Sequence, residues 1–185
     1  MVYIDTIPES DARGELADLY RRLAYADGSV DDAYKALSLN PRLLAADAAL
    51  YDTLMYGESP LSRVERELLA LTVSRLNGCD RCVAHHAARY AALTAEAPLD
   101  EPSGASAAEP ATDREQALVA FTTQLTLRPS AIRREDIDRL RQVGLEDRAI
   151  LDACNVVAYF GYANRVTLGL GIEPAANGPG KGQRA

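Results

Sequence analysis

Residues 67–86 read Glu67-Leu-Leu-Ala-Leu-Thr-Val-Ser-Arg-Leu-Asn-Gly-Cys79-Asp-Arg-Cys82-Val-Ala-His85-His86. This stretch holds two of the three cysteines and both histidines of the 185-residue chain. A Cys-x-x-Cys pair with a histidine four residues beyond its second cysteine is typical of thiol redox chemistry, because the histidine can take the thiol proton. We therefore expect the reactive groups of the protein to lie in this stretch.

The stretch predicts two helices joined by a tight turn. Ser62 and Glu65 fit a capping box that starts the first helix, which should run to about Leu76. Asn77-Gly78 then favours a left-handed stop. The second helix should begin at Cys79 and continue to about residue 92, so that the Cys-x-x-Cys pair lies on its first turn.

Helical spacing brings Cys79, Cys82 and His86 together on one face, within about 60° of each other at roughly 100° per residue. Cβ atoms three or four residues apart are about 5–6 Å from each other, which a disulfide can bridge with modest adjustment. His86 lies one turn from Cys82, close enough to exchange a proton. The positive end of the helix dipole favours the thiolate there. His85 points away from His86 and is the less favoured participant.

Glu67 lies on the preceding helix, at the edge of an apolar stripe. If the two helices pack antiparallel, Glu67 and His86 lie at comparable depth on either side of the turn. A proton relay Glu67–His86–Cys82 is then stereochemically reasonable. The competing interpretation is a salt bridge from Glu67 to Arg63 or Arg75.

The rest of the chain predicts an all-α fold without strands or repeats. Residues 1–173 should form one helical domain, with 94–113 as a mobile loop and 174–185 as a disordered tail. Helical periodicity predicts further helices at residues 9–24, 32–39, 41–56, 113–127, 135–143 and 146–168. The last of these is apolar on several faces and should lie in a core or an interface. Cys154 on it is expected to be a buried, inert thiol.

The composition narrows the function classes. A net charge of −7 and a pI near 4.9 argue against nucleic acid as a main partner. No secretory signal is visible and no run approaches the ~18 apolar residues of a membrane span, so we expect a cytoplasmic protein without a membrane partner. In that reducing compartment three cysteines do not form a structural disulfide framework.

Two segments resemble the AhpD-like alkylhydroperoxidases of the carboxymuconolactone decarboxylase superfamily. The first is Glu65-Arg-Glu-Leu-Leu-Ala-Leu-Thr-Val-Ser-Arg-Leu-Asn-Gly-Cys79, within the pattern Glu-x(11)-Cys-x-x-Cys-x-x-x-His. The second is Val156-Val-Ala-Tyr-Phe-Gly-Tyr-Ala-Asn-Arg-Val-Thr-Leu-Gly-Leu-Gly-Ile-Glu-Pro174, which is similar to a longer, peroxidase-related branch. The resemblance implies an AhpD-like helical fold, assembly into a homo-oligomer and thiol-dependent reduction of hydroperoxides.

The resemblance also implies a role for each residue of the motif. Cys82 would attack the peroxide, Cys79 would resolve the product as a disulfide, and His86 and Glu67 would form the proton relay. A lipoylated or thioredoxin-like protein would restore the dithiol, and neither an organic cofactor nor a metal would be needed. Arg81 stands where the best-known members carry a further histidine, which puts the transfer of their proton network and reductant in doubt.

Other interpretations of the motif stay open at this stage. The cysteines could be ordinary buried thiols, or could bind zinc together with His86 and Glu67. The superfamily also contains cofactor-free decarboxylases of lactone acids, whose chemistry does not depend on the cysteine pair. Finally, the dithiol could serve a non-catalytic, redox-sensing oligomer in which oxidation changes packing.

Overall fold

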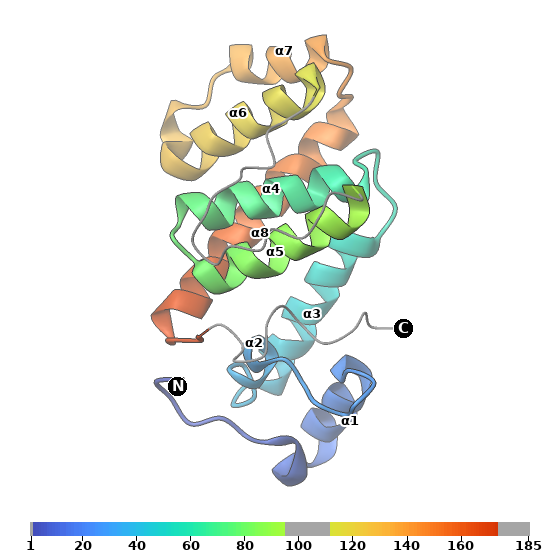
Figure 1. The fold of residues 1–185 in the computed structure, drawn as a ribbon, viewed down its shortest axis with the longest axis vertical. Coiled ribbons are helices and arrows are strands. Elements are labelled where there is room, and N and C mark those ends of the chain that lie inside the picture. Colours follow the sequence, from blue (N-terminus) through green and yellow to red (C-terminus); the bar gives the residue numbers. More distant parts are fainter. Residues whose placement is uncertain (1, 95–111, 174–185) are drawn as a thin grey trace.

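The computed structural model describes residues 2–94 and 112–173, and within them it contains helices and no strand. The predicted all-α class is confirmed. Figure 1 shows α4 and α5 side by side at the centre of the molecule, with α6 and α7 at one end and α1 to α3 at the other. The central helices are α4 (Arg63–Leu76), α5 (Asp80–Thr94) and α8 (Asp147–Gly169). The other elements are η1 (Glu9–Asp11), α1 (Gly14–Leu23), α2 (Asp32–Lys35), α3 (Pro41–Tyr56), α6 (Asp113–Leu127), η2 (Pro129–Ala131) and α7 (Arg134–Gln142).

The helix boundaries follow local capping chemistry. The predicted capping box is present, because the Ser62 hydroxyl accepts from the backbone of Glu65 and the Glu65 carboxylate accepts from the backbone of Ser62. Helix α6 has the predicted bounds 113–127, and its N-cap is Thr112, in a second capping box with Glu115. The first predicted helix is split into η1 and α1, because the backbone is extended at Ala12.

The core consists of two clusters of apolar side chains. The larger one packs α4, α6, α7 and α8 together, and the smaller one joins α1, α2 and α3. Helix α8 contacts α3, α4, α6 and α7, which places it centrally as its apolar sequence predicts. Each large aliphatic side chain that is fully buried contributes roughly 1.5–3 kcal/mol, so the larger cluster holds α4 in place, and α5 packs against α4.

The predicted loop 94–113 and the predicted tail 174–185 lie almost wholly outside the described residues. Where they can be compared, Thr94 is the last residue of α5, and Thr112 and Asp113 begin α6. Of the described helices, none combines the length and the hydropathy that crossing a membrane requires.

Candidate active site

The turn between α4 and α5 is built by a Schellman motif. The backbone N–H of Cys79 donates to the carbonyl of Ser74 at 3.0 Å, and that of Gly78 donates to Arg75 at 3.1 Å. Gly78 has φ of 66°, a left-handed conformation in which a side chain is strained. The predicted left-handed stop is thus present, and it fixes where the first cysteine emerges.

Both cysteines lie at the positive end of α5. The helix begins at Asp80, one residue later than predicted, and the carbonyl of Cys79 accepts its first hydrogen bond, from Val83. Cys79 is 1 % exposed, whereas Cys82 is half-buried. A disulfide joins the two, with their Cα atoms 5.3 Å apart. Cys82, on the first turn of the helix, is therefore the more accessible residue of the pair.

Glu67 and His86 meet in the core between α4 and α5. Their side chains are almost fully buried, and Nδ1 of His86 lies 2.7 Å from Oε2 of Glu67. The other oxygen of Glu67 accepts from Arg63 at 2.8 Å. Phe160 of α8 packs edge-on against the His86 ring, with the centroids 4.5 Å apart. The two interpretations of Glu67 are therefore compatible: it contacts His86 and also pairs with Arg63, rather than with Arg75.

These contacts decide which nitrogen of His86 is available. A carboxylate paired with a guanidinium accepts hydrogen bonds, so Nδ1 of His86 is the nitrogen that carries a proton toward Glu67. Nε2 then holds the lone pair, on a residue one turn from Cys82. Because both oxygens of Glu67 are engaged, Glu67 could not join a zinc site without giving up Arg63 or His86. Within residues 2–94 and 112–173, no group of three or more His, Cys, Asp or Glu side chains could hold a metal ion.

His85 has a separate environment. Its Nε2 accepts from Nε of Arg89 at 2.9 Å, and Arg89 also donates to the hydroxyl of Tyr56 at 2.9 Å. Burial lowers the pKa of His85 to about 3, and the neighbouring charges of His86 and Arg89 act in the same direction. His85 is therefore neutral at physiological pH. The sequence pattern predicted neither the contact of His85 with Arg89 nor that of Arg89 with Tyr56.

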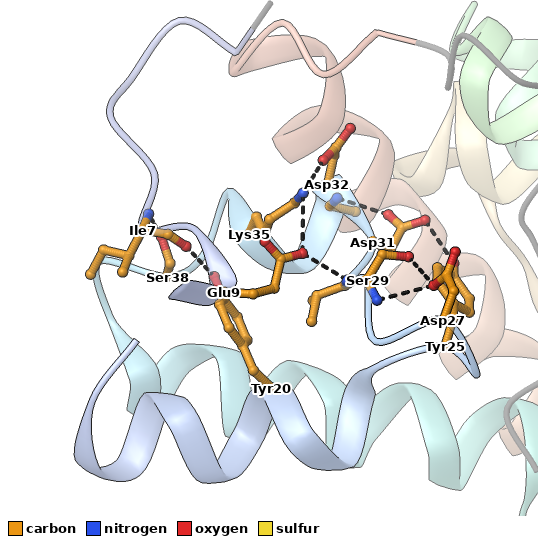
Figure 2. A network of polar contacts seen from close by, with 12 residues as sticks. Ile7, Glu9, Tyr20, Tyr25, Asp27, Ser29, Asp31, Asp32, Lys35 and Ser38 are labelled. Carbon is orange, nitrogen blue, oxygen red and sulfur yellow. Dashed lines mark hydrogen bonds and ion pairs between the residues drawn. The ribbon is translucent and has the colours of Figure 1, made fainter. Parts of the chain in front are cut away.

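Arg81, between the two cysteines, is tied to the segment that joins α1 and α2. It pairs with Asp31 at 2.5 Å and donates to the carbonyl of Glu173 at 3.0 Å. Although burial opposes it, the charge of Arg81 and hydrogen bonds from Ala33 and Tyr25 hold the pKa of Asp31 below its usual value. Figure 2 shows the polar contacts that fix this segment, including the bond from Tyr25 to Asp31. The charge of Arg81 is therefore compensated, and its side chain does not project freely outward.

A buried polar network anchors the turn to α8. The side chain of Asn77 donates to Asn164 at 3.0 Å, and Asn164 donates to the Ser74 hydroxyl at 3.3 Å. Asn164 and Ser74 are fully buried. An asparagine in the apolar helix α8 was the available signal for this contact. Cys154, on the same helix, is half-buried rather than buried as predicted, and desolvation raises the pKa of its thiol.

Comparison with known proteins gives one family. The model of the carboxymuconolactone decarboxylase family matches residues 41–124, which include Glu67, Cys79, Cys82 and His86. A peroxidase-related protein from Silicibacter sp. TM1040 is 30% identical, with a TM-score of 0.84 over 97% of this chain and 95% of that one. A peroxidase-related protein with an alkylhydroperoxidase AhpD core, from Ralstonia eutropha JMP134, is 23% identical, with a TM-score of 0.75 over 94% of this chain and 95% of that one.

The fold also occurs with another activity. The debrominase Bmp8 is 18% identical and has a TM-score of 0.71, over 92% of this chain and 91% of that one. A search of curated proteins finds no match to the chain. The fold is therefore shared by proteins with different chemistry, so function has to be inferred from the residues of the site.

Proposed function

The chain belongs to the AhpD-like carboxymuconolactone decarboxylase superfamily, whose members include enzymes, and we propose that it reduces hydroperoxides with the Cys79/Cys82 dithiol. The proposal rests mainly on the geometry of one cysteine and one histidine. The half-buried Cys82 lies one turn from His86, whose Nδ1 is held by Glu67 at 2.7 Å inside the core. This arrangement supplies a nucleophile, a base and a group that orients the base.

The first step oxidises Cys82. Nε2 of His86 takes the thiol proton, and the thiolate attacks the terminal oxygen of the hydroperoxide. The O–O bond breaks, Cys82 becomes a sulfenic acid, and the alkoxide leaves with the proton that His86 returns. Glu67 stabilises the imidazolium that forms in between.

The second step closes the disulfide. The sulfur of Cys79 attacks the sulfenic sulfur of Cys82, and the hydroxyl leaves as water with the Cys79 proton. The Cα separation of 5.3 Å lies within the range for disulfides. An external dithiol, for which we propose a lipoylated or thioredoxin-like protein, then reduces the disulfide and is itself oxidised. We also propose a homo-oligomer working in the cytoplasm, where such reductants occur.

The test compares single-cysteine variants in a coupled peroxide-consumption assay. Cys82→Ser should abolish turnover of cumene hydroperoxide, and Cys79→Ser should allow one oxidation without recycling. Cys154→Ser is the matched control and should keep turnover. Activity of Cys82→Ser equal to that of the wild type would refute the proposal. Decarboxylation of a lactone acid that survives loss of both thiols would instead favour the cysteine-independent branch of the superfamily.

A further inference from the structure

Arg89 of α5 is a half-buried arginine, and its two hydrogen-bond partners among the described residues are neutral. Its Nε donates to His85 and one terminal nitrogen donates to Tyr56. Among the residues that the structure describes, it forms no ion pair, whereas Arg63 pairs with Glu67 and Arg81 pairs with Asp31. The two carboxylates of this region are thus committed to other cations. A guanidinium without an ion pair among the described residues is suited to an external anion.

The neighbours of Arg89 keep its charge and its position. His85 accepts from Arg89, so it is neutral and adds no charge of its own. The Arg63 guanidinium lies over the Tyr56 ring, 4.0 Å from the centroid, and holds the phenol in place. Tyr56 is 51% exposed, so its contact with Arg89 lies at the surface. The hydroxyl of Tyr56 accepts from Arg89 and retains its own proton to donate.

Residue Arg89 lies on the face of α5 that carries Cys82. The two residues are seven positions apart, which on an α-helix means a turn of only about 20° around the axis. Because the side chain reaches back to His85, its guanidinium lies about one helical turn beyond Cys82 along the axis. The charge of Arg89 also acts on Tyr25, in the segment between α1 and α2. Arg89 thus lies near this segment and Tyr56, on the same face of α5 as Cys82.

We propose that Arg89, together with the hydroxyl of Tyr56, binds a carboxylate of the substrate. The preferred substrates are then organic hydroperoxides whose carboxylate lies about 5 Å from the peroxide group, the length of one helical turn. This inference rests on the proposed function. One guanidinium, with three N–H groups that bond no other described residue, matches the two oxygens and single charge of a carboxylate. The chain as a whole has a net charge of −7, which disfavours the binding of an anion. The local positive charge of Arg89 must therefore attract the carboxylate.

The test uses two substrates that differ only in charge: cumene hydroperoxide and its para-carboxylate derivative. The readout is the ratio of kcat/KM for the charged substrate to that for the neutral one. In the wild type we expect this ratio to exceed one. Arg89→Gln should lower it roughly 10- to 100-fold, the range for loss of a charge-assisted hydrogen bond. Arg89→Lys, which keeps the charge without the planar guanidinium, should give an intermediate ratio. It replaces Arg89→Gln as the test variant if the Gln variant does not fold.

Arg42→Gln is the matched control, because Arg42 is exposed on α3. Its selectivity ratio should equal that of the wild type. A ratio that is the same in the wild type and in Arg89→Gln would overturn the inference, even if both substrates are reduced.

A binding experiment separates this inference from the proposed function. If the wild type reduces neither substrate, the peroxidase proposal fails, and calorimetry with the unreactive alcohol 4-(2-hydroxypropan-2-yl)benzoate decides the inference. Binding to the wild type that is lost in Arg89→Gln would support a carboxylate site. Absent binding, or equal binding to both proteins, would overturn it.

Discussion

The carboxylate of Glu67 and the imidazole of His86 lie 2.7 Å apart in the core, although 19 residues separate them in the sequence. The α4–α5 hairpin creates this contact, and Phe160 of α8 closes it from one side. Since Arg63 holds the other oxygen of Glu67, the pair is fixed at both ends. The contact orients His86, for which we propose a role as the base for Cys82.

Replacing Glu67 by Gln should slow the oxidation of Cys82. The amide keeps the shape but no longer stabilises the imidazolium, so we expect a loss of roughly 10- to 100-fold, as for other partners that orient a histidine. Stopped-flow measurement of thiol loss at fixed hydroperoxide gives the rate. Glu58→Gln, at an exposed position, is the control and should match the wild type. An unchanged rate in Glu67→Gln would remove Glu67 from the relay.

Replacing Gly78 by Ala should destabilise the protein by about 1–2 kcal/mol, because its φ of 66° is strained for any residue with a Cβ. The added methyl would meet no atom within 4 Å, so strain and not a clash is the cause. Urea denaturation measures the change. Gly169→Ala is the matched control, since it also has open space but lacks a positive φ, and it should be neutral or slightly stabilising. Equal effects of the two substitutions would contradict the turn geometry.

Asp31→Asn should lower stability at neutral pH by roughly 1–3 kcal/mol, through the lost pair with Arg81. The pKa of Asp31 is depressed below its usual value of 3.8, so its stabilising effect is present above that pH. It is lost as the pH falls through the lower pKa of the folded state. Urea midpoints of variant and wild type should therefore converge below about pH 4. Asp5→Asn, at an exposed position, is the control, and a pH-independent difference for Asp31→Asn would be evidence against the pair.

His85→Gln should flatten the acid dependence of stability. In the folded state the pKa of His85 is lowered to about 3 from the usual 6.5. Between these values the unfolded chain binds the proton and the folded one does not, so stability falls as pH falls, by at most about 1.4 kcal/mol per pH unit. Denaturant unfolding from pH 7 to pH 3.5 measures the slope. A slope that His85→Gln leaves unchanged would show that His85 is not held neutral.

Local signals predicted the parts of the site that lie on one hairpin. The start of α4 follows from Ser62 and Glu65, and its end follows from Gly78, because caps and left-handed stops are short-range features. The contact of Glu67 with His86 followed from the antiparallel register of two helices of known length. The catalytic roles of Cys79, Cys82, His86 and Glu67 stay predictions.

The remaining contacts join segments that sequence periodicity cannot bring together. Arg81 and Asp31 are 50 residues apart, and Asn164 and Ser74 are 90 apart. Such pairs depend on how whole helices dock, which is set by the packing of both core clusters. The contact between Arg89 and Tyr56 could not be predicted for the same reason, since nothing in either local sequence marks one as the partner of the other.

The central claim is most directly tested by mapping the thiols of the fully reduced protein after one equivalent of cumene hydroperoxide. Mass spectrometry should show rapid loss of two thiols per chain, a Cys79–Cys82 disulfide, an unmodified Cys154 and one equivalent of cumyl alcohol. Thiols that stay reduced in excess hydroperoxide, or oxidation that falls on Cys154 instead, would contradict a dithiol peroxidase.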